Sequence, residues 1–78
     1  MASSHRASDA LLAECCECSL KALADLQRSV IDLMDAKASP FGDRTDDLLR
    51  TMDAIGAFRF PRDWETISPN RKRAKAHG

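Results

Sequence analysis

The three cysteines of the chain lie within four consecutive positions, as Cys15, Cys16 and Cys18. Cysteine thiolates bind zinc and carry out disulfide exchange, so this cluster is the first candidate for chemistry. On a helix, Cys15 and Cys18 share a face, and Cys16 points about 100° away from Cys15. The cluster forms either a reactive site or part of a packed helix face.

Neither zinc binding nor redox catalysis fits the surroundings of the cluster well. A structural zinc site needs four ligands, and the two histidines, His5 and His77, lie near opposite ends of the chain. Two copies could pool their Cys15 and Cys18 thiols, so metal binding is a minor alternative. Thioredoxin-like motifs lie at a helix N-terminus, whereas this Cys-x-x-Cys motif lies inside an expected helix next to two glutamates. We therefore expect no metal or cofactor, with Cys16 in the core, Cys15 at the edge of an interface and Cys18 exposed.

The other reactive side chains do not form a recognisable catalytic or calcium site. A Ser-His-Asp triad needs a histidine that a folded element orients, and both histidines lie in expected flexible ends. Asp43, Asp46 and Asp47 lack the spacing of an EF-hand loop, so helix capping is the better account of them. A chain of 78 residues also encloses little concave volume. We predict that the protein is not an enzyme.

The elements that position these residues are predicted to be helices bounded by proline and glycine. Aromatic residues make up 5% of the chain and Gly and Pro number three each, so an all-α fold is favoured. A long amphipathic helix is predicted over residues 8–38, and the Pro/Gly turn in residues 39–42 breaks it. A shorter antiparallel helix is expected over residues 43–58 and a short third helix over residues 61–68. The result is a helical hairpin or bundle.

The long helix carries an apolar stripe with heptad spacing. Six of its seven a and d positions are apolar, and the exception is Ser19. Apolar residues at two e positions widen the stripe, which favours a bundle of three or four helices. One short chain cannot cover so long a stripe, so we expect dimerisation or a partner to complete the core. The residues expected to form this partner or oligomer interface are Leu12, Cys16, Leu20, Leu23, Leu26, Val30, Leu33 and Met34.

Two shorter apolar faces follow in the second and third helices. Their residues recur three or four positions apart, as expected for one side of a helix. Most aromatic clusters of this kind close a local core, but Trp beside Arg is also typical of an interface hot spot. The residues expected to form this secondary interface or core closure are Leu48, Met52, Ile55, Phe58, Phe60, Trp64 and Ile67.

Charge is distributed unevenly along the chain. It has 12 basic and 12 acidic residues, and all of the acids precede residue 69. We predict a flexible N-terminus at residues 1–7, a helical domain at residues 8–68 and a disordered basic tail at residues 69–78. This tail could serve as a nuclear-import signal, contact nucleic-acid phosphates or only aid solubility. Its cations are Arg71, Lys72, Arg73 and Lys75.

The sequence contains no sign of secretion or membrane insertion. No apolar run approaches the roughly 18 residues that a membrane span needs, and the first residues lack the apolar core of a signal peptide. Clustered cysteines in odd number favour a reducing compartment. We expect an intracellular protein, cytoplasmic and/or nuclear, without membrane contact.

These observations favour a small helical protein-interaction module. It would act as an adaptor, complex subunit or binding inhibitor, as a homodimer or hetero-oligomer, through its coiled-coil-like apolar stripe. The alternative is a small helical dimer that binds nucleic acid through phosphate contacts and its basic tail. The acidic balance of residues 1–68 disfavours this alternative, because it would repel phosphate over most of the surface.

Overall fold

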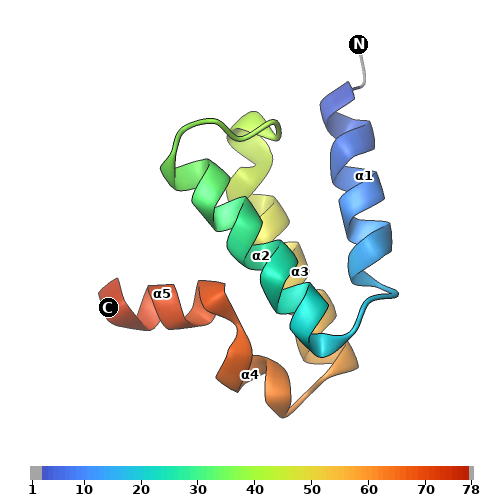
Figure 1. Cartoon of the computed structure of the whole chain (residues 1–78), viewed down its shortest axis with the longest axis vertical. Helices are drawn as coiled ribbons and strands as arrows, with labels where there is room; N and C mark the ends of the chain where they lie inside the picture. Colours follow the sequence, from blue (N-terminus) through green and yellow to red (C-terminus); the bar gives the residue numbers. More distant parts are fainter. Residues whose placement is uncertain (1–2, 78) are drawn as a thin grey trace.

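The computed structural model describes the backbone of residues 3–77 and the side chains of residues 8–74. Its elements are α1 (Ser3–Cys15), α2 (Leu20–Asp35), the short 3-10 helix η1 (Gly42–Arg44), α3 (Thr45–Arg59), α4 (Asp63–Ile67) and α5 (Pro69–His77). Every element in this part of the chain is helical, which confirms the all-α prediction. Helices α2 and α3 run antiparallel, α1 lies along one side of them, and α4 leads to α5 near one end (Figure 1).

The single helix predicted over residues 8–38 is wrong, because the chain turns between α1 and α2. Ser19 adopts an extended conformation, with φ −72° and ψ 168°, immediately before α2. Its Oγ accepts a hydrogen bond of 3.3 Å from the backbone N–H of Ala22, which is the usual role of an N-cap residue. Ser19 is the one polar residue of the predicted heptad stripe. The position that interrupts the apolar pattern therefore also interrupts the helix.

The turn changes how the apolar stripe is covered. A straight helix of about 45 Å would extend beyond the short helices that follow it. Instead, α1 folds back and contacts both α2 and α3 (Figure 1). The radius of gyration is 12.0 Å, close to the roughly 11.5 Å of a compact domain of this length. One copy of the chain thus buries a core of its own.

The buried face of α2 is rotated from the predicted seam. The residues that α2 buries occupy the a, b and e positions of the predicted heptad. Leu26 and Leu33, which occupy d positions, lie at the edge of this buried face. The reason is that α2 packs against α3, α4 and α5 as well as α1, and neighbours on several sides select a wide face. The residues buried along α2 are Leu23, Ala24, Gln27, Val30 and Ile31.

The predicted Pro/Gly break between the long first helix and the second helix is confirmed by the connection from α2 to α3. A Schellman motif ends α2: the N–H of Ala38 donates to the carbonyl of Leu33 at 2.9 Å, and the N–H of Lys37 donates to that of Met34 at 3.0 Å. Lys37 takes the left-handed conformation that this motif requires, with φ 56°. The chain then turns back into η1, so that α3 runs along α2.

Gly56 allows the indole ring of Trp64 to lie directly against α3. A Cβ atom at position 56 would lie 2.2 Å from Cδ2 of Trp64, which is far inside van der Waals contact. Trp64 is fully buried as a result. Glycine at this position therefore serves packing of the third short helix, at some cost in helix propensity.

The basic segment expected to be disordered forms helix α5 in the structure. Ser68 acts as its N-cap, since the Ser68 Oγ accepts a hydrogen bond of 3.3 Å from the N–H of Arg71. Pro69 occupies the first helical position, where its missing N–H is not needed. The Ser-Pro pair thus starts a helix at the point where the third predicted helix was expected to end. At the N-terminal side, a flexible segment was expected over residues 1–7, but α1 begins at Ser3. Residues 1–2 and 78 lie outside the described part of the chain.

Candidate functional site

The three cysteines lie in different surroundings. Cys15 is fully buried and Cys16 is exposed, so the expectation that Cys16 lies in the core and Cys15 at an edge is wrong. Burial away from water, with a smaller effect of the neighbouring Cys18, raises the pKa of the Cys15 thiol to about 12. Cys15 is therefore a protonated core residue at neutral pH. Cys18 is half-buried, not fully exposed, and its Sγ lies 3.7 Å from the carbonyl oxygen of Cys15.

Much of the predicted interface stripe lies in the chain's own core. Leu23 is fully buried and Val30 is 3% exposed. Leu12, Leu20, Leu26 and Met34 are half-buried and pack against this core. Cys16, in the turn after α1, and Leu33, in α2, remain exposed. The stripe as a whole is therefore not left open for a partner.

The second predicted set divides into core residues and one exposed aromatic ring. Leu48, Met52 and Trp64 are buried, and Ile55, Phe60 and Ile67 are half-buried against them. Phe58 is different, because 88% of it is exposed to solvent. A single exposed apolar side chain is common on protein surfaces, so the significance of Phe58 depends on the apolar surface beside it.

Phe58 forms one wall of an apolar hollow between the end of α1 and the outer face of α3. The hollow has a volume of about 440 Å³. Cys16, Ile55 and Phe58 were predicted to lie in interfaces, and the structure brings them together here. Thr51 and Ala54 were not predicted, although they lie seven and four residues before Phe58 and so share its face of α3. The lining residues are Cys16, Thr51, Ala54, Ile55, Phe58 and Arg59.

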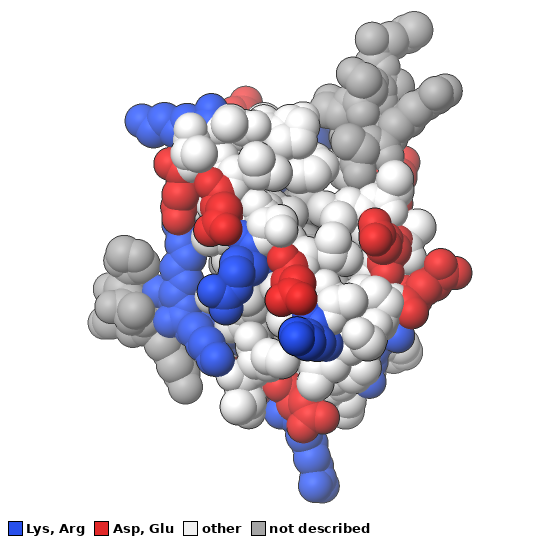
Figure 2. Space-filling model, viewed as in Figure 1, with Lys and Arg blue, Asp and Glu red and all other residues white. Residues whose placement is uncertain are grey.

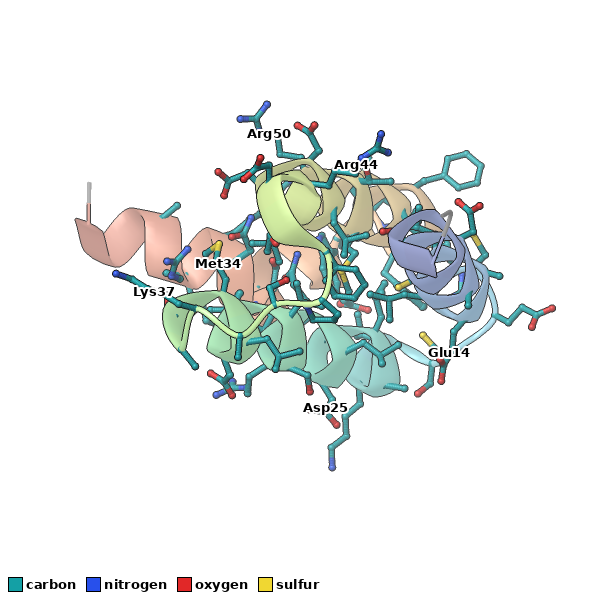
Figure 3. The ribbon with its side chains drawn as sticks, turned by 90° about the horizontal axis from the view of Figure 1, so that it is seen from above. Glu14, Asp25, Met34, Lys37, Arg44 and Arg50 are labelled. Carbon is teal, nitrogen blue, oxygen red and sulfur yellow. The ribbon has the colours of Figure 1, made fainter. Side chains whose placement is uncertain are left out.

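A second hollow continues from the first toward the beginning of α3. It measures about 380 Å³ and shares Thr51 with the first, so together they form a groove along α1 and α3, which we call the α1/α3 groove. The second hollow is more polar, and Asp47 on its wall lies 3.9 Å from the exposed Arg50. Arg44 and Arg50 project on the side of the molecule opposite Asp25 of α2 (Figure 3). The lining residues are Ser8, Asp9, Leu12, Arg44, Asp47, Leu48 and Thr51.

The basic segment is partly neutralised by the body of the protein. Arg71 lies 2.9 Å from Glu65, and Arg73 lies 3.1 Å from Asp35. Lys72 is exposed, and Lys75 lies outside the described side chains. Acidic and basic side chains alternate over the face that carries α2 and α5, without a broad patch of either sign (Figure 2). This arrangement gives phosphates a limited basic surface to contact.

A buried polar network fastens α5 to the body, and sequence analysis missed it. The amide of Gln27, fully buried in α2, donates to Asp53 Oδ1 at 2.9 Å and accepts from the Ser68 hydroxyl at 2.8 Å. Asp53 also accepts from Trp64 Nε1 at 3.0 Å and from Asn70 Nδ2 at 2.7 Å. One residue could have indicated the network from the sequence. Gln27 is a polar residue at an e position of the stripe, between the apolar e positions Leu20 and Met34. The network is structural, because its donors and acceptors satisfy one another.

Metal binding and membrane insertion find no specific support in the described residues. Over the searched part of the chain, no group of three or more His, Cys, Asp or Glu side chains is arranged to hold a metal ion. None of the helices described is long and apolar enough to cross a bilayer. Comparisons of the chain with protein-family models, curated proteins and solved structures found no match.

Proposed function

We propose that the protein is a non-enzymatic helical interaction module that binds a protein partner through the α1/α3 groove. The observation that carries this proposal is Phe58, 88% exposed beside an apolar hollow. Buried aromatic anchors dominate the binding energy of most protein interfaces, and a ring next to a hollow offers both an anchor and a receptor. An adaptor, a complex subunit or a binding inhibitor would each use the surface in this way.

The groove has the shape that a helical partner requires. Two adjacent helices, α1 and α3, form its walls, and apolar side chains from both lie along its floor. An amphipathic helix docks in such a groove by placing residues from successive turns in contact with the floor. The charged residues of the second hollow then lie at the rim, where charges mainly select partners.

Affinity capture with matched variants tests the proposal. Tagged wild-type chain, Phe58→Ser and Leu33→Ser are compared in nuclease-treated lysate of the source organism, under reducing conditions, with quantitative mass spectrometry. Leu33 is the matched control, because it is an exposed apolar residue on α2, away from the groove. A protein, the chain itself included, that is retained by wild type and by Leu33→Ser but lost by Phe58→Ser supports the proposal. Equal retention of every bound protein by all three would overturn it.

Nucleic-acid binding through the basic segment has less support. Two of its four cations, Arg71 and Arg73, form ion pairs with carboxylates of the body. Binding to phosphate would have to replace these pairs, although each exposed pair opposes it by at most about 1 kcal/mol. Retardation of duplex DNA or RNA by the wild type at about 0.15 M salt, abolished by removing residues 70–78, would favour the alternative.

A further inference from the structure

We propose that helix α5 is an autoinhibitory strap, which undocks as a unit while α1 to α4 stay folded. In the docked state, α5 pairs its cations with carboxylates of the body. In the undocked state, it presents these cations to the phosphates of a nucleic acid. The inference goes beyond the proposed function and uses a different surface, because α5 packs against α2 and α4 (Figure 1).

Helix α5 differs from the other helices in the absence of large apolar side chains. After its first proline, its sequence contains no apolar residue larger than alanine. Each of α1 to α4 supplies side chains to the hydrophobic core or its edge, and the described side chains of α5 supply none. Because apolar burial is the main favourable term in folding, α5 lacks the contribution that holds the other helices in place.

Hydrogen bonds to two side chains of the body hold the first turn of α5. Asn70 donates from Nδ2 to Asp53 Oδ2 at 2.7 Å and from its backbone N–H to Gln27 Oε1 at 3.2 Å. The hydroxyl of Ser68, the N-cap, lies within hydrogen-bond distance of the same two side chains. An element that is held by a few bonds at one end opens at a lower free energy than the core does.

The connection between α4 and α5 allows α5 to move by itself. Ser68 lies between the two helices with φ −59° and ψ 117°, which is not a helical conformation. Trp64 of α4 packs directly against Gly56 of α3, so α4 has an attachment of its own. Rotation about Ser68 therefore moves α5 without removing Trp64 from the core.

Docking places the cations of α5 beside acidic side chains. Residues 69–78 carry four cations and no acid, and all of the acids of the chain precede them. In the docked state, Arg71 is paired with Glu65 and Arg73 with Asp35. A phosphate that approaches docked α5 is repelled by these and other carboxylates of the body, whereas undocking carries the cations away from them. Docking thus inhibits phosphate binding.

A nucleic acid fits the released segment better than a membrane surface does. A helix that lies on a membrane needs an apolar face, which α5 lacks. Contact with a phosphate backbone needs only clustered Lys and Arg side chains. The affinity of the wild type is then reduced by the fraction of molecules in which α5 is undocked.

Native-state hydrogen exchange of the full chain tests whether α5 opens by itself. The amide groups of Arg71 and Lys72 donate to Ser68, so they report on the first turn of α5. We expect them to be at least about tenfold less protected than the buried amides of α2, with little dependence on urea, because undocking exposes little apolar surface. Equal protection and equal urea dependence would mean that α5 opens only with the whole fold, and would overturn the inference.

Asn70→Asp weakens docking without opposing the helix itself. The helix dipole favours a carboxylate in the first turn. Next to Asp53, however, the new carboxylate removes a hydrogen bond and adds repulsion between like charges. Ala74→Asp is the matched control, because it makes the same change of charge at an exposed position of α5. Asn70→Asp should lower the protection of Arg71 and Lys72 at least about tenfold and Ala74→Asp less than about threefold.

Fluorescence anisotropy with a DNA duplex of about 20 base pairs, at about 0.05 M salt, tests the inhibition. We expect Asn70→Asp to bind about tenfold more tightly than the wild type, although it carries one more negative charge, because α5 is undocked in more molecules. Ala74→Asp should bind more weakly than the wild type, since it adds the charge without undocking. If Asn70→Asp does not bind, or binds no more tightly than the wild type, the inference is overturned.

Discussion

The guanidinium group of Arg59 closes the end of a helix that lies 44 positions earlier in the chain. Its Nη1 donates hydrogen bonds to the carbonyl oxygens of Cys15, at 2.7 Å, and Cys18, at 2.5 Å. These carbonyls lie at the end of α1 and in the turn to α2, where helical partners are lacking. The same guanidinium lies 4.8 Å from the ring centroid of Phe60. Arg59 thus stabilises the turn that the heptad pattern failed to predict.

Loss of this cap should destabilise the fold. We expect Arg59→Ala to lower the free energy of unfolding by about 1.5–3 kcal/mol, because hydrogen bonds to a charged donor are lost and two carbonyls are left unsatisfied. Urea unfolding followed by circular dichroism measures the change. Arg50→Ala is the control, since Arg50 is exposed and its distant pair with Asp47 should contribute less than about 0.5 kcal/mol. Equal effects of the two substitutions would argue against the cap.

Gly56→Ala distinguishes the effect of helix propensity from that of packing, because the two predict changes of opposite sign in the free energy of unfolding. Propensity alone predicts a gain of about 1 kcal/mol for alanine in a helix. The structure predicts a loss of about 1–3 kcal/mol, since the new methyl group would lie 2.2 Å from the indole of Trp64. Thermal unfolding decides between them, and a red shift of the Trp64 fluorescence should accompany the loss. A more stable variant would show that Trp64 does not pack against Gly56.

Asp53 should be the most sensitive position of the polar network. Its carboxylate accepts hydrogen bonds from Gln27, Trp64, Ser68 and Asn70. We expect Asp53→Ala to lower the free energy of unfolding by about 3 kcal/mol or more, because several buried donors lose their acceptor. Hydrogen exchange should show that the amides of α5 lose protection first.

A double-mutant cycle checks that the network acts as a unit. Asp53→Ala combined with Asn70→Ala should cost less than the two single changes added together, because both remove the same hydrogen bond. Asp32→Ala, an exposed carboxylate on α2, is the control and should change stability by less than about 0.5 kcal/mol. Strict additivity would mean that the two side chains act independently.

Lys37→Gly should stabilise the protein. Lys37 has φ 56° in the Schellman motif that ends α2, and an L side chain is strained in this conformation by roughly 1–2 kcal/mol. Glycine removes that strain but gains freedom in the unfolded chain, so we expect a net increase of about 0.5–1 kcal/mol. Chemical denaturation measures the midpoint. Lys37→Ala is the control and should leave the midpoint nearly unchanged, since alanine keeps the Cβ atom.

The buried thiol of Cys15 should make stability fall in alkaline solution. Its pKa is raised from 9.0 to about 12 in the folded chain, chiefly by burial. The unfolded chain therefore loses this proton first, so the contribution is complete below about pH 9 and is lost as the pH rises to about 12. Urea unfolding from pH 8 to 11 should show a shallower decline for Cys15→Ala than for the wild type. Parallel declines would mean that Cys15 ionises equally in both states.

The local features of the fold could be predicted from the sequence, and the long-range ones could not. Proline and glycine disfavour helix continuation in any tertiary context, so Pro40 and Gly42 correctly predicted the break at residues 39–42. The turn at Ser19 depends on a local cap that a single serine only weakly indicates, and on Arg59 at a distance. Helix α5 was missed because its N-cap, Ser68, is fixed by partners from other helices.

The candidate site shows the same division. Heptad counting identified apolar residues but not which of them the chain would bury itself, because that depends on the rotation of α2 against its neighbours. Phe58 was included with Trp64 as one aromatic cluster, yet the structure buries Trp64 and leaves Phe58 exposed. The two rings differ because Trp64 packs against Gly56, whereas Phe58 lies two residues after Gly56 on α3 and so points to nearly the opposite side of that helix.

The hydrogen bonds of Gln27 set a limit on how the protein can fold during synthesis. Gln27 is buried near the middle of α2, but its carbonyl oxygen accepts from Ser68 and from the backbone N–H of Asn70, 43 residues later. This carbonyl oxygen reaches its partners within the protein only after Ser68 and Asn70 have left the ribosome. Helices α1 to α3 must therefore emerge with an incomplete core, and the final cooperative step follows translation of the C-terminal segment.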